Sequence, residues 1–351
     1  MKKLLLACSF LAFFALDAQA QDPFFSQFYA APITLNPALT GAFNGKYRVS
    51  GIYRDQYRDI LDAQFSTYAV SADLRFTPDN YRSTSKDQIG VGVSFITDRM
   101  GEFDYAYNQL NVSAAYHKSL NPQNNAYLSV GAQFGMNQKT INYGSLTFSD
   151  QFNGTSGYVF GTNENLPENN VAFSDLAVGI NFTANPTRNI QIFAGATLHH
   201  VLAPNVSFYK FDDDEEEDPY QNFIPRRYGA QFSIRLPVSE KFSIMPRAIG
   251  DVQGGNVKVD AGLNYRFLLS SYNGTALQLG TYARLLRDED SGVSLSSGIA
   301  MVGIEYSNVL LGLSYDAHIG TFGTNAPRSA FEISLAYLGN YENELVLCPK
   351  F

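Results

Sequence analysis

The sequence lacks any run of 18 or more apolar residues beyond its first twenty positions, which excludes a transmembrane helix in that part of the chain. It also lacks an excess of basic residues. Lysine and arginine number 25 against 33 aspartates and glutamates, and this acidic balance disfavours nucleic-acid binding, which needs a basic face. Two common enzyme motifs are missing as well, because the chain has neither a phosphate-binding loop nor a G-x-S-x-G nucleophile elbow.

The first twenty residues are typical of a secretory signal peptide. Lys2 and Lys3 precede an apolar run over Leu4–Leu16, and Ala18-Gln19-Ala20 matches the small-residue cleavage pattern. We expect cleavage after Ala20, which leaves a mature chain of 331 residues with a single cysteine, Cys348. An intrachain disulfide is thereby excluded, so the stability of the mature protein has to come from its sheet.

Alternation with a period of two is abundant. In Val257–Phe267 every second residue is apolar, and the positions between them include Lys258, Asp260 and Arg266. Successive side chains of a strand point to opposite faces, so one face of this segment suits hydrocarbon and the other suits water. Segments of about ten residues with this pattern recur along nearly the whole chain, as in transmembrane β-barrels. We therefore predict an all-β fold, a closed antiparallel transmembrane β-barrel of about 14 strands.

Closure is required because every backbone N–H and C=O must be paired inside lipid. The strands are expected at Lys46–Gln56, Gln64–Phe76, Gln88–Thr97, Tyr105–His117, Ala126–Asn137, Phe173–Thr183, Ile190–Val201, Arg227–Leu236, Lys241–Asp251, Val257–Phe267, Ala276–Leu285, Gly298–Tyr306, Asn308–Asp316 and Ala330–Leu338. An even strand number places both chain ends on one side. If that side is the periplasm, the longer connections lie outside the cell, among them Lys139–Ala172, Ala203–Arg226, Leu286–Ser297 and Ala317–Ser329.

The barrel is expected to fill residues 46–338 of a protein in the outer membrane. A periplasmic segment over residues 21–45 precedes it, and a periplasmic tail over 339–351 follows it. Charges of both signs, such as Arg247, Asp260 and Asp316, fall at inward positions. They either form a salt-bridged plug or line water, and the sequence leaves these two alternatives open.

No candidate site for catalysis, a cofactor or a metal stands out. His199 and His200 are adjacent in an expected strand, so we expect their side chains on opposite faces, where they cannot share a metal ion. The acidic run Asp212–Asp218 is interpreted as a hydrated outer loop. Binding of Ca²⁺ by this run is the weaker alternative, because it lacks the spacing of an EF-hand loop.

The two ends of the mature chain carry motifs of a known family. They are Gln21-Asp22-Pro23, Phe25-Ser26-Gln27-Phe28-Tyr29, Leu35-Asn36-Pro37-Ala38, Thr40-Gly41 and, at the C-terminus, Cys348-Pro349-Lys350-Phe351, where arginine is commoner than Lys350. These motifs resemble those of the PorP/SprF family. The resemblance implies a barrel of the type IX secretion system in Bacteroidota that helps to export or anchor large surface proteins, including gliding adhesins. It implies as partners a secreted cargo protein at the outer face, periplasmic secretion components and outer-membrane lipid.

The N-terminal segment holds most of the candidate site. Its aromatic side chains need a partner surface, because they are not stable when exposed to periplasmic water. Two alternatives are open: the segment fills the mouth of the barrel as a plug, or it docks onto another subunit of the translocon. The candidate plug or partner-binding residues are Phe24, Phe25, Gln27, Phe28, Tyr29, Asn36, Pro37, Cys348 and Pro349.

The expected function is therefore non-enzymatic binding in type IX secretion. A passive channel for small solutes is one alternative. An outer-membrane hydrolase that uses His199 and inward acidic residues is another. The most distant alternative is a soluble secreted β-sandwich, which stays open because its antiparallel sheets show the same alternation.

Overall fold

The computed structural model describes residues 22–58, 64–78, 86–101, 104–187, 190–209, 221–288, 292–319 and 329–339. The expected signal peptide, the acidic run Asp212–Asp218 and the tail from residue 340 onward lie outside the described residues. No helix in the described part of the chain has the length and apolar character needed to cross a membrane.

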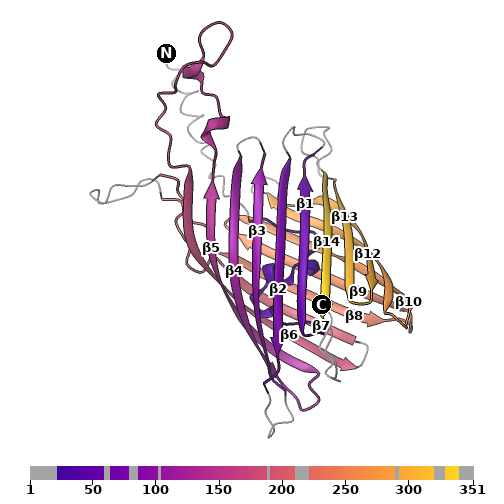
Figure 1. Ribbon diagram of the computed structural model, residues 1–351. Helices are drawn as coiled ribbons and strands as arrows, with labels where there is room; N and C mark the ends of the chain where they lie inside the picture. The colour runs from indigo at the N-terminus through magenta and orange to yellow at the C-terminus, as the bar shows by residue number, and fades with distance from the viewer. Residues whose placement is uncertain are drawn as a thin grey trace.

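Strands make up most of the described residues. They are β1 (Tyr47–Gln56), β2 (Phe65–Phe76), β3 (Gln88–Met100), β4 (Tyr105–Ser119), β5 (Ala126–Thr140), β6 (Asn170–Thr187), β7 (Ile190–His199), β8 (Arg227–Pro237), β9 (Phe242–Gln253), β10 (Asn256–Ser270), β11 (Thr275–Asp288), β12 (Gly292–Tyr306), β13 (Val309–His318) and β14 (Ser329–Gly339). Each pairs antiparallel with its neighbour in sequence, and β1 pairs with β14 to close the ring (Figure 1). The predicted closed barrel of 14 antiparallel strands is confirmed.

The two faces of the wall follow the alternation in the sequence. In β5, Val130 and Phe134 are exposed on the outer face, whereas Ser129 and Gln133 are buried inside. A shift of one residue in the strand register would exchange these two sets. The outer surface therefore presents hydrocarbon to lipid, and the inner surface gathers the polar groups.

Two departures from the predicted strand boundaries have local causes. The sequence predicts a loop over Leu286–Ser297, but much of it belongs to β11 and β12, where a bulge places both Ser296 and Ser297 inside the barrel. The bulge interrupts the alternation of apolar and polar residues, so the sequence pattern does not reveal this part of the two strands. β7 ends at His199 instead of Val201, because His200 has φ +57° and leaves the extended conformation.

Residues 22–45, which the sequence assigns to the periplasm, lie inside the barrel. They form the short helices η1 (Phe28–Ala30), α2 (Pro32–Leu35) and η2 (Pro37–Leu39), drawn in indigo within the ring of strands in Figure 1. Asp22 contacts His200 near the end of β7, whereas Lys46 donates its backbone N–H to Gly339 at the opposite end of the barrel. We call residues 22–45 the N-terminal segment; it runs through the interior from one end of the barrel to the other.

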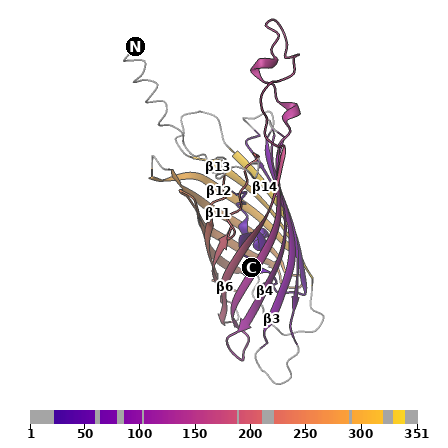
Figure 2. The ribbon, with the colours of Figure 1, turned by 90° about the vertical axis from the view of Figure 1, so that its left-hand side faces the viewer.

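The long connections gather at one end of the barrel. The β5–β6 connection, residues 141–169, contains η3 (Tyr143–Ser145) and η4 (Ser149–Gln151) and rises well beyond the rim in two perpendicular views (Figure 1 and Figure 2). The β7–β8 and β13–β14 connections leave the wall at the same end, which we call the loop end. The sequence predicts that the loop end faces the outside of the cell.

Val112 tests the assignment of the lipid-facing side. Its side chain is 62% exposed on the outer face of β4. We expect Val112→Arg to lower the free energy of unfolding by about 2 to 4 kcal/mol, the cost of arginine near the bilayer midplane. The measurement is urea-dependent folding of the mature protein in lipid vesicles. Val159→Arg in the β5–β6 connection is the matched control, and an equal loss in both variants would contradict the assignment.

Candidate functional site

Glu332 on β14 lies at the centre of the contacts that hold the N-terminal segment. Its side chain is fully buried, and its carboxylate accepts hydrogen bonds from the backbone N–H groups of Ser26 and Gln27 at 2.7 and 2.9 Å. Arg54 on β1 forms an ion pair with the same carboxylate. A buried carboxylate is tolerated only when it is paired and hydrogen-bonded. The backbone of the segment therefore completes the hydrogen bonding of the buried Glu332 side chain.

Further charges from neighbouring strands converge on Ser26. Asp316 Oδ2 on β13 lies 3.0 Å from Arg54 Nη1 and 2.9 Å from Arg284 Nη1 on β11. Arg284 Nε also contacts Asp260 Oδ1 on β10 at 2.7 Å, and its Nη2 donates to Ser26 Oγ at 2.7 Å. The serine hydroxyl donates in turn to Asp316. The segment is thus part of an ion network that spans five strands.

Phe24 packs among the cations of this network. The centroid of its ring lies 4.1 Å from Lys258 Nζ, 4.6 Å from Arg284 Cζ and 4.9 Å from Arg54 Cζ. The negative face of an aromatic ring attracts cations, and the attraction is larger where water is excluded. Phe24 therefore binds the wall by charge as well as by apolar contact.

Asn36 and Pro37 anchor the middle of the segment. The Asn36 side chain accepts a hydrogen bond from Ala38 N at 2.8 Å, which caps η2, and donates to the backbone oxygens of Ile180 and Ala196 at 3.2 Å each. Asparagine is a preferred residue at this capping position, and proline suits the first position of a helix. One side chain thus fixes both the local turn and its attachment to β6 and β7.

Asp73 on β2 holds the far end of the segment. Its Oδ2 accepts from Gly41 N at 2.7 Å, and Arg48 on β1 pairs with both carboxylate oxygens at 2.9 and 2.7 Å. Gly41 has φ +76°, a conformation that favours glycine. Two buried carboxylates, Asp73 and Glu332, therefore clamp the backbone of the segment at separate points.

The structure brings most of the predicted site residues together inside the barrel. Phe24 is half-buried, and the buried members of the set are Phe25, Gln27, Phe28, Tyr29, Asn36 and Pro37. Cys348 and Pro349 lie outside the described residues. The described contacts of the segment are those of a plug, and binding of a partner by these residues stays a prediction.

His200 ties the start of the segment to the wall at the loop end. Its Nε2 lies 2.6 Å from Asp22 Oδ2 and its Nδ1 lies 2.6 Å from Asp175 Oδ2, while Arg227 Nη1 approaches Asp22 at 3.3 Å. Burial opposes the charged imidazole, but the two carboxylates outweigh it and raise the pKa of His200 to about 9. Burial also opposes the charged form of Asp22, yet Arg227 and His200 lower the pKa of this carboxyl group below its ordinary value.

The expectation that His199 and His200 point to opposite faces is wrong. Both side chains are buried and line the same pocket. β7 ends at His199, and the positive φ of His200 turns its side chain back inside. His199 Nε2 lies 3.3 Å from the backbone oxygen of Leu35. Among the described residues there is no group of three or more histidine, cysteine or acidic side chains that could hold a metal ion.

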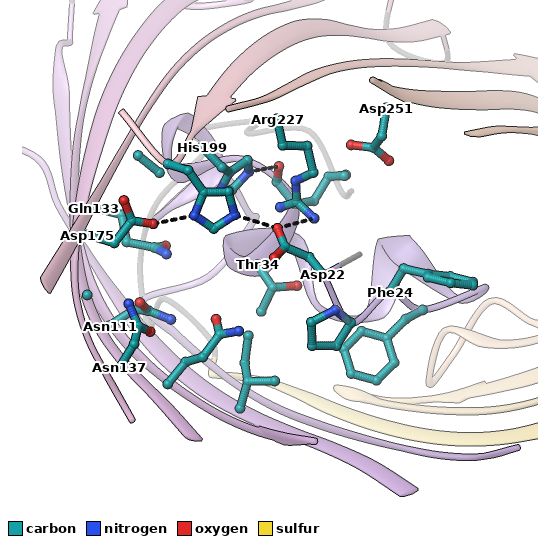
Figure 3. A pocket seen from close by; sticks show the side chains of 18 of the residues that line it. Asp22, Phe24, Thr34, Asn111, Gln133, Asn137, Asp175, His199, Arg227 and Asp251 are labelled. Carbon is teal, nitrogen blue, oxygen red and sulfur yellow. Dashed lines mark hydrogen bonds and ion pairs between the residues drawn. The ribbon is translucent and has the colours of Figure 1, made fainter. Parts of the chain in front are cut away.

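The pocket lies between the N-terminal segment and the wall near the loop end, and we call it the mouth pocket. The space between its lining residues, which opens to solvent, is about 860 Å³. Figure 3 shows Asn111, Gln133 and Asn137 on the side of β4 and β5, and Asp22 and Phe24 on the side of the segment. The two sides differ in chemistry, since one offers amide groups and the other an aromatic ring beside charges. This arrangement can bind a ligand by hydrogen bonds and apolar contact.

The family model of the type IX secretion system membrane protein PorP/SprF matches residues 17–337, nearly the whole chain. The chain belongs to the PorP/SprF family. Membership makes it a membrane protein of type IX secretion, and its fold is that of an outer-membrane β-barrel. A search of the curated proteins found no match for this PorP/SprF protein.

Several solved barrels are similar to the PorP/SprF chain at low sequence identity. The CymD monoaromatic hydrocarbon channel is 11% identical, with a TM-score of 0.48 over 90% of this chain and 94% of that one. A FadL homologue from Pseudomonas aeruginosa is 10% identical, with a TM-score of 0.46 over 86% and 92%. The P. putida toluene transporter TodX is 12% identical, with a TM-score of 0.44 over 90% and 94%.

Sequence reasoning missed several wall residues that bind the segment in this PorP/SprF barrel. Arg48, Arg54 and Asp73 are buried at inward positions of β1 and β2. Glu332 alternates with the apolar residues Phe331 and Ile333, which predicts an inward position, but nothing in the sequence identifies its partners. The signal that marks such residues is a charge on the polar face of a strand that is otherwise typical of lipid contact.

Gly131 on β5 tests the position of the segment in the PorP/SprF barrel. A methyl group there would lie 2.4 Å from both Ala38 N and Pro37 C. We therefore expect Gly131→Ala to displace the segment and to cost about 1 to 3 kcal/mol, as overpacking does. The measurements are the melting temperature in detergent and chymotrypsin cleavage at the aromatic residues of the segment. Gly250→Ala, where the nearest atom is 3.7 Å away, is the control; a wild-type response of both variants would argue against the plug.

The ion pairs of His200 predict a pH dependence. Since its pKa rises from 6.5 to about 9 on folding, its stabilising contribution is complete below pH 6.5 and is lost as the pH rises through 9. The full contribution is at most about 3 kcal/mol. We expect the difference in melting temperature between wild type and His200→Gln to shrink over this interval. A difference that stays constant from pH 6 to pH 10 would show that His200 is not charged in the folded protein.

Proposed function

We propose that this chain is a non-enzymatic binding component of type IX secretion that helps to export or anchor large surface proteins such as gliding adhesins. Its loop end holds the secreted cargo at the cell surface, and its opposite end contacts periplasmic secretion components. The mature protein, formed by cleavage after Ala20, resides in the outer membrane among its lipids. No catalytic step and no cofactor is needed for this role.

The observation that carries the proposal is the apolar surface of the β5–β6 connection. Phe152, Tyr158, Val159 and Phe160 have exposed fractions of 44, 55, 67 and 58% beyond the rim of the barrel. Monomeric proteins rarely leave such side chains gathered in water unless they serve an interaction. Exposed aromatic residues are also the usual anchors of protein–protein interfaces.

The backbone of this connection holds these side chains in place. Phe152 and Tyr158 form an antiparallel bridge, and their ring centroids lie 5.4 Å apart. Between them the Asn153 side chain accepts hydrogen bonds from the backbone N–H groups of Thr155, Ser156 and Gly157 at 3.0 to 3.2 Å. A preformed turn loses less conformational entropy when a partner binds. We call residues 152–160 the projecting hairpin.

The filled interior supports binding over passage. The N-terminal segment is held by hydrogen bonds from its backbone N–H groups to the buried carboxylates of Glu332 and Asp73, and a hydrogen bond to a charged group contributes about 1.5 to 3 kcal/mol. A barrel with such an interior is better suited to retain a partner at its rim than to conduct solutes. This feature favours the binding role over the alternative of a passive channel.

The projecting hairpin provides the test. We expect the triple variant Tyr158→Ser, Val159→Ser and Phe160→Ser to reduce display of a type IX cargo protein on the cell surface at least about tenfold, because it removes several apolar anchors. Cargo on cells and in the medium is quantified by immunoblotting, together with the amount of the barrel itself. Deletion of the gene should have the same effect or a larger one.

The matched control replaces the same three residues conservatively, by Tyr158→Phe, Val159→Ile and Phe160→Leu. These changes keep the apolar surface of the hairpin, so cargo display should stay at the wild-type level. Normal display in both the triple variant and the deletion strain would refute the proposed function.

A further inference from the structure

The mouth pocket is lined by a row of side-chain amide groups. Gln109 and Asn111 on β4, and Gln133 and Asn137 on β5, all line it. Gln133 is 92% buried, and its Oε1 has no hydrogen-bond partner. Asn111 Nδ2 has one long contact, 3.5 Å to Ser94 Oγ. A buried polar atom without a partner is costly, so Gln133 is suited to a ligand that supplies a donor, and the neighbouring amides can offer that ligand further donors and acceptors.

The spacing of the amides fits an extended peptide. Residues two apart on a strand are separated by about 6.7 Å, which is also the repeat of a peptide that lies alongside the strand. Gln133 and Asn137 are four residues apart on the same face of β5, and the side chain of Asn111 on β4 lies over Gly135 between them, which makes the row continuous. Each side-chain amide carries a donor and an acceptor and can therefore pair with the N–H and C=O groups of a peptide backbone.

The wall already recognises a peptide backbone in this way. Glu332 and Asp73 accept hydrogen bonds from backbone N–H groups of the N-terminal segment. Arg48 donates to one of its backbone oxygens at 3.3 Å, and His117 Nε2 lies 2.8 Å from another. Capture of backbone groups by inward side chains is thus the rule inside this barrel. The amide row offers the same kind of contact.

The charges around the mouth pocket balance. His200, Arg227 and Lys258 are cationic, and they face the carboxylates of Asp22, Asp175 and Asp251. A ligand without net charge therefore leaves these pairs intact, whereas a strongly charged one would have to break them. On the other side, Phe25 and Leu35 of the segment provide an apolar surface.

We propose that the mouth pocket binds a short, uncharged, extended peptide segment of another protein, whose backbone pairs with the amide row and whose apolar side chain packs against the N-terminal segment. Gln133 to Asn137 spans about 13 Å, the length of about four extended residues. The inference rests on the proposed function for the source of the peptide, which is an exported protein held at the loop end.

The experiment uses the full mature barrel in detergent micelles and a mixture of N-acetylated, C-amidated pentapeptides of uncharged residues. Peptides that stay with the protein through gel filtration are quantified by mass spectrometry. We expect wild type to retain peptides that contain an aromatic or aliphatic residue. The double variant Gln133→Leu and Asn137→Leu should retain at least about tenfold less, since several hydrogen bonds are lost.

Two controls distinguish recognition of the peptide backbone from nonspecific adsorption of peptides to the protein. Gln231→Leu removes another buried inward amide without partners, one that does not line the pocket, and it should behave like wild type. Backbone N-methylated versions of the retained peptides should not bind, because they have lost their donors. Equal retention by the double variant or retention of the N-methylated peptides would overturn the proposal, as would no retention by a correctly folded wild type. Maltotetraose, an uncharged chain that forms hydrogen bonds without a peptide backbone, should not displace the peptides, and displacement would also overturn the proposal.

The outcomes also separate this proposal from the proposed function. If deletion of the gene abolishes cargo display while wild type retains no peptide, the pocket proposal fails and the proposed function stands. If wild type retains peptides through the amide row while the deletion strain displays its cargo normally, the peptide site stands and the proposed function fails.

Discussion

The architecture depends on how a buried carboxylate is satisfied. Glu332 is fully buried, and three of its partners lie far away in sequence, with Ser26 separated from it by 306 residues. Without the backbone N–H groups of the N-terminal segment, the acid would keep only Arg54 and a long contact, 3.4 Å, from Ser314 Oγ, which is unfavourable in the interior. The same contacts hold the segment, fill the lumen and give the mouth pocket one of its sides.

The sequence predicted the wall well because lipid imposes a strict rule on it. Val130 and Phe134 must face out, and Ser129 and Gln133 must face in, so alternation alone locates the strands. The rule fails where the backbone departs from a regular strand. The bulge at Ser296 and Ser297 and the positive φ of His200 are set by local geometry and neighbouring strands, and a pattern of residue types contains no information on either.

The sequence predicted which segment forms the candidate site, but not which residues of the wall contact it. Aromatic and proline-rich motifs marked residues 24–37 as important, yet they were equally compatible with a plug and with a docking arm. The deciding contacts connect Asn36 to Ile180 and Gly41 to Asp73, and no local pattern encodes such pairs. The amide row was invisible for a related reason, since Gln109 and Asn137 become neighbours only through the β4–β5 register.

The closure of the ring by β1 and β14 has a consequence for biogenesis. Glu332 belongs to the last strand to leave the ribosome, whereas Ser26 and Gln27 belong to the first part of the mature chain. A completed cylinder with every strand edge paired offers no entrance between strands, so the segment enters either before β1 and β14 pair or through an open end of the barrel. In both cases the contacts of Glu332 join the two ends of the chain, and the entropic cost of that closure grows with the length of chain between them.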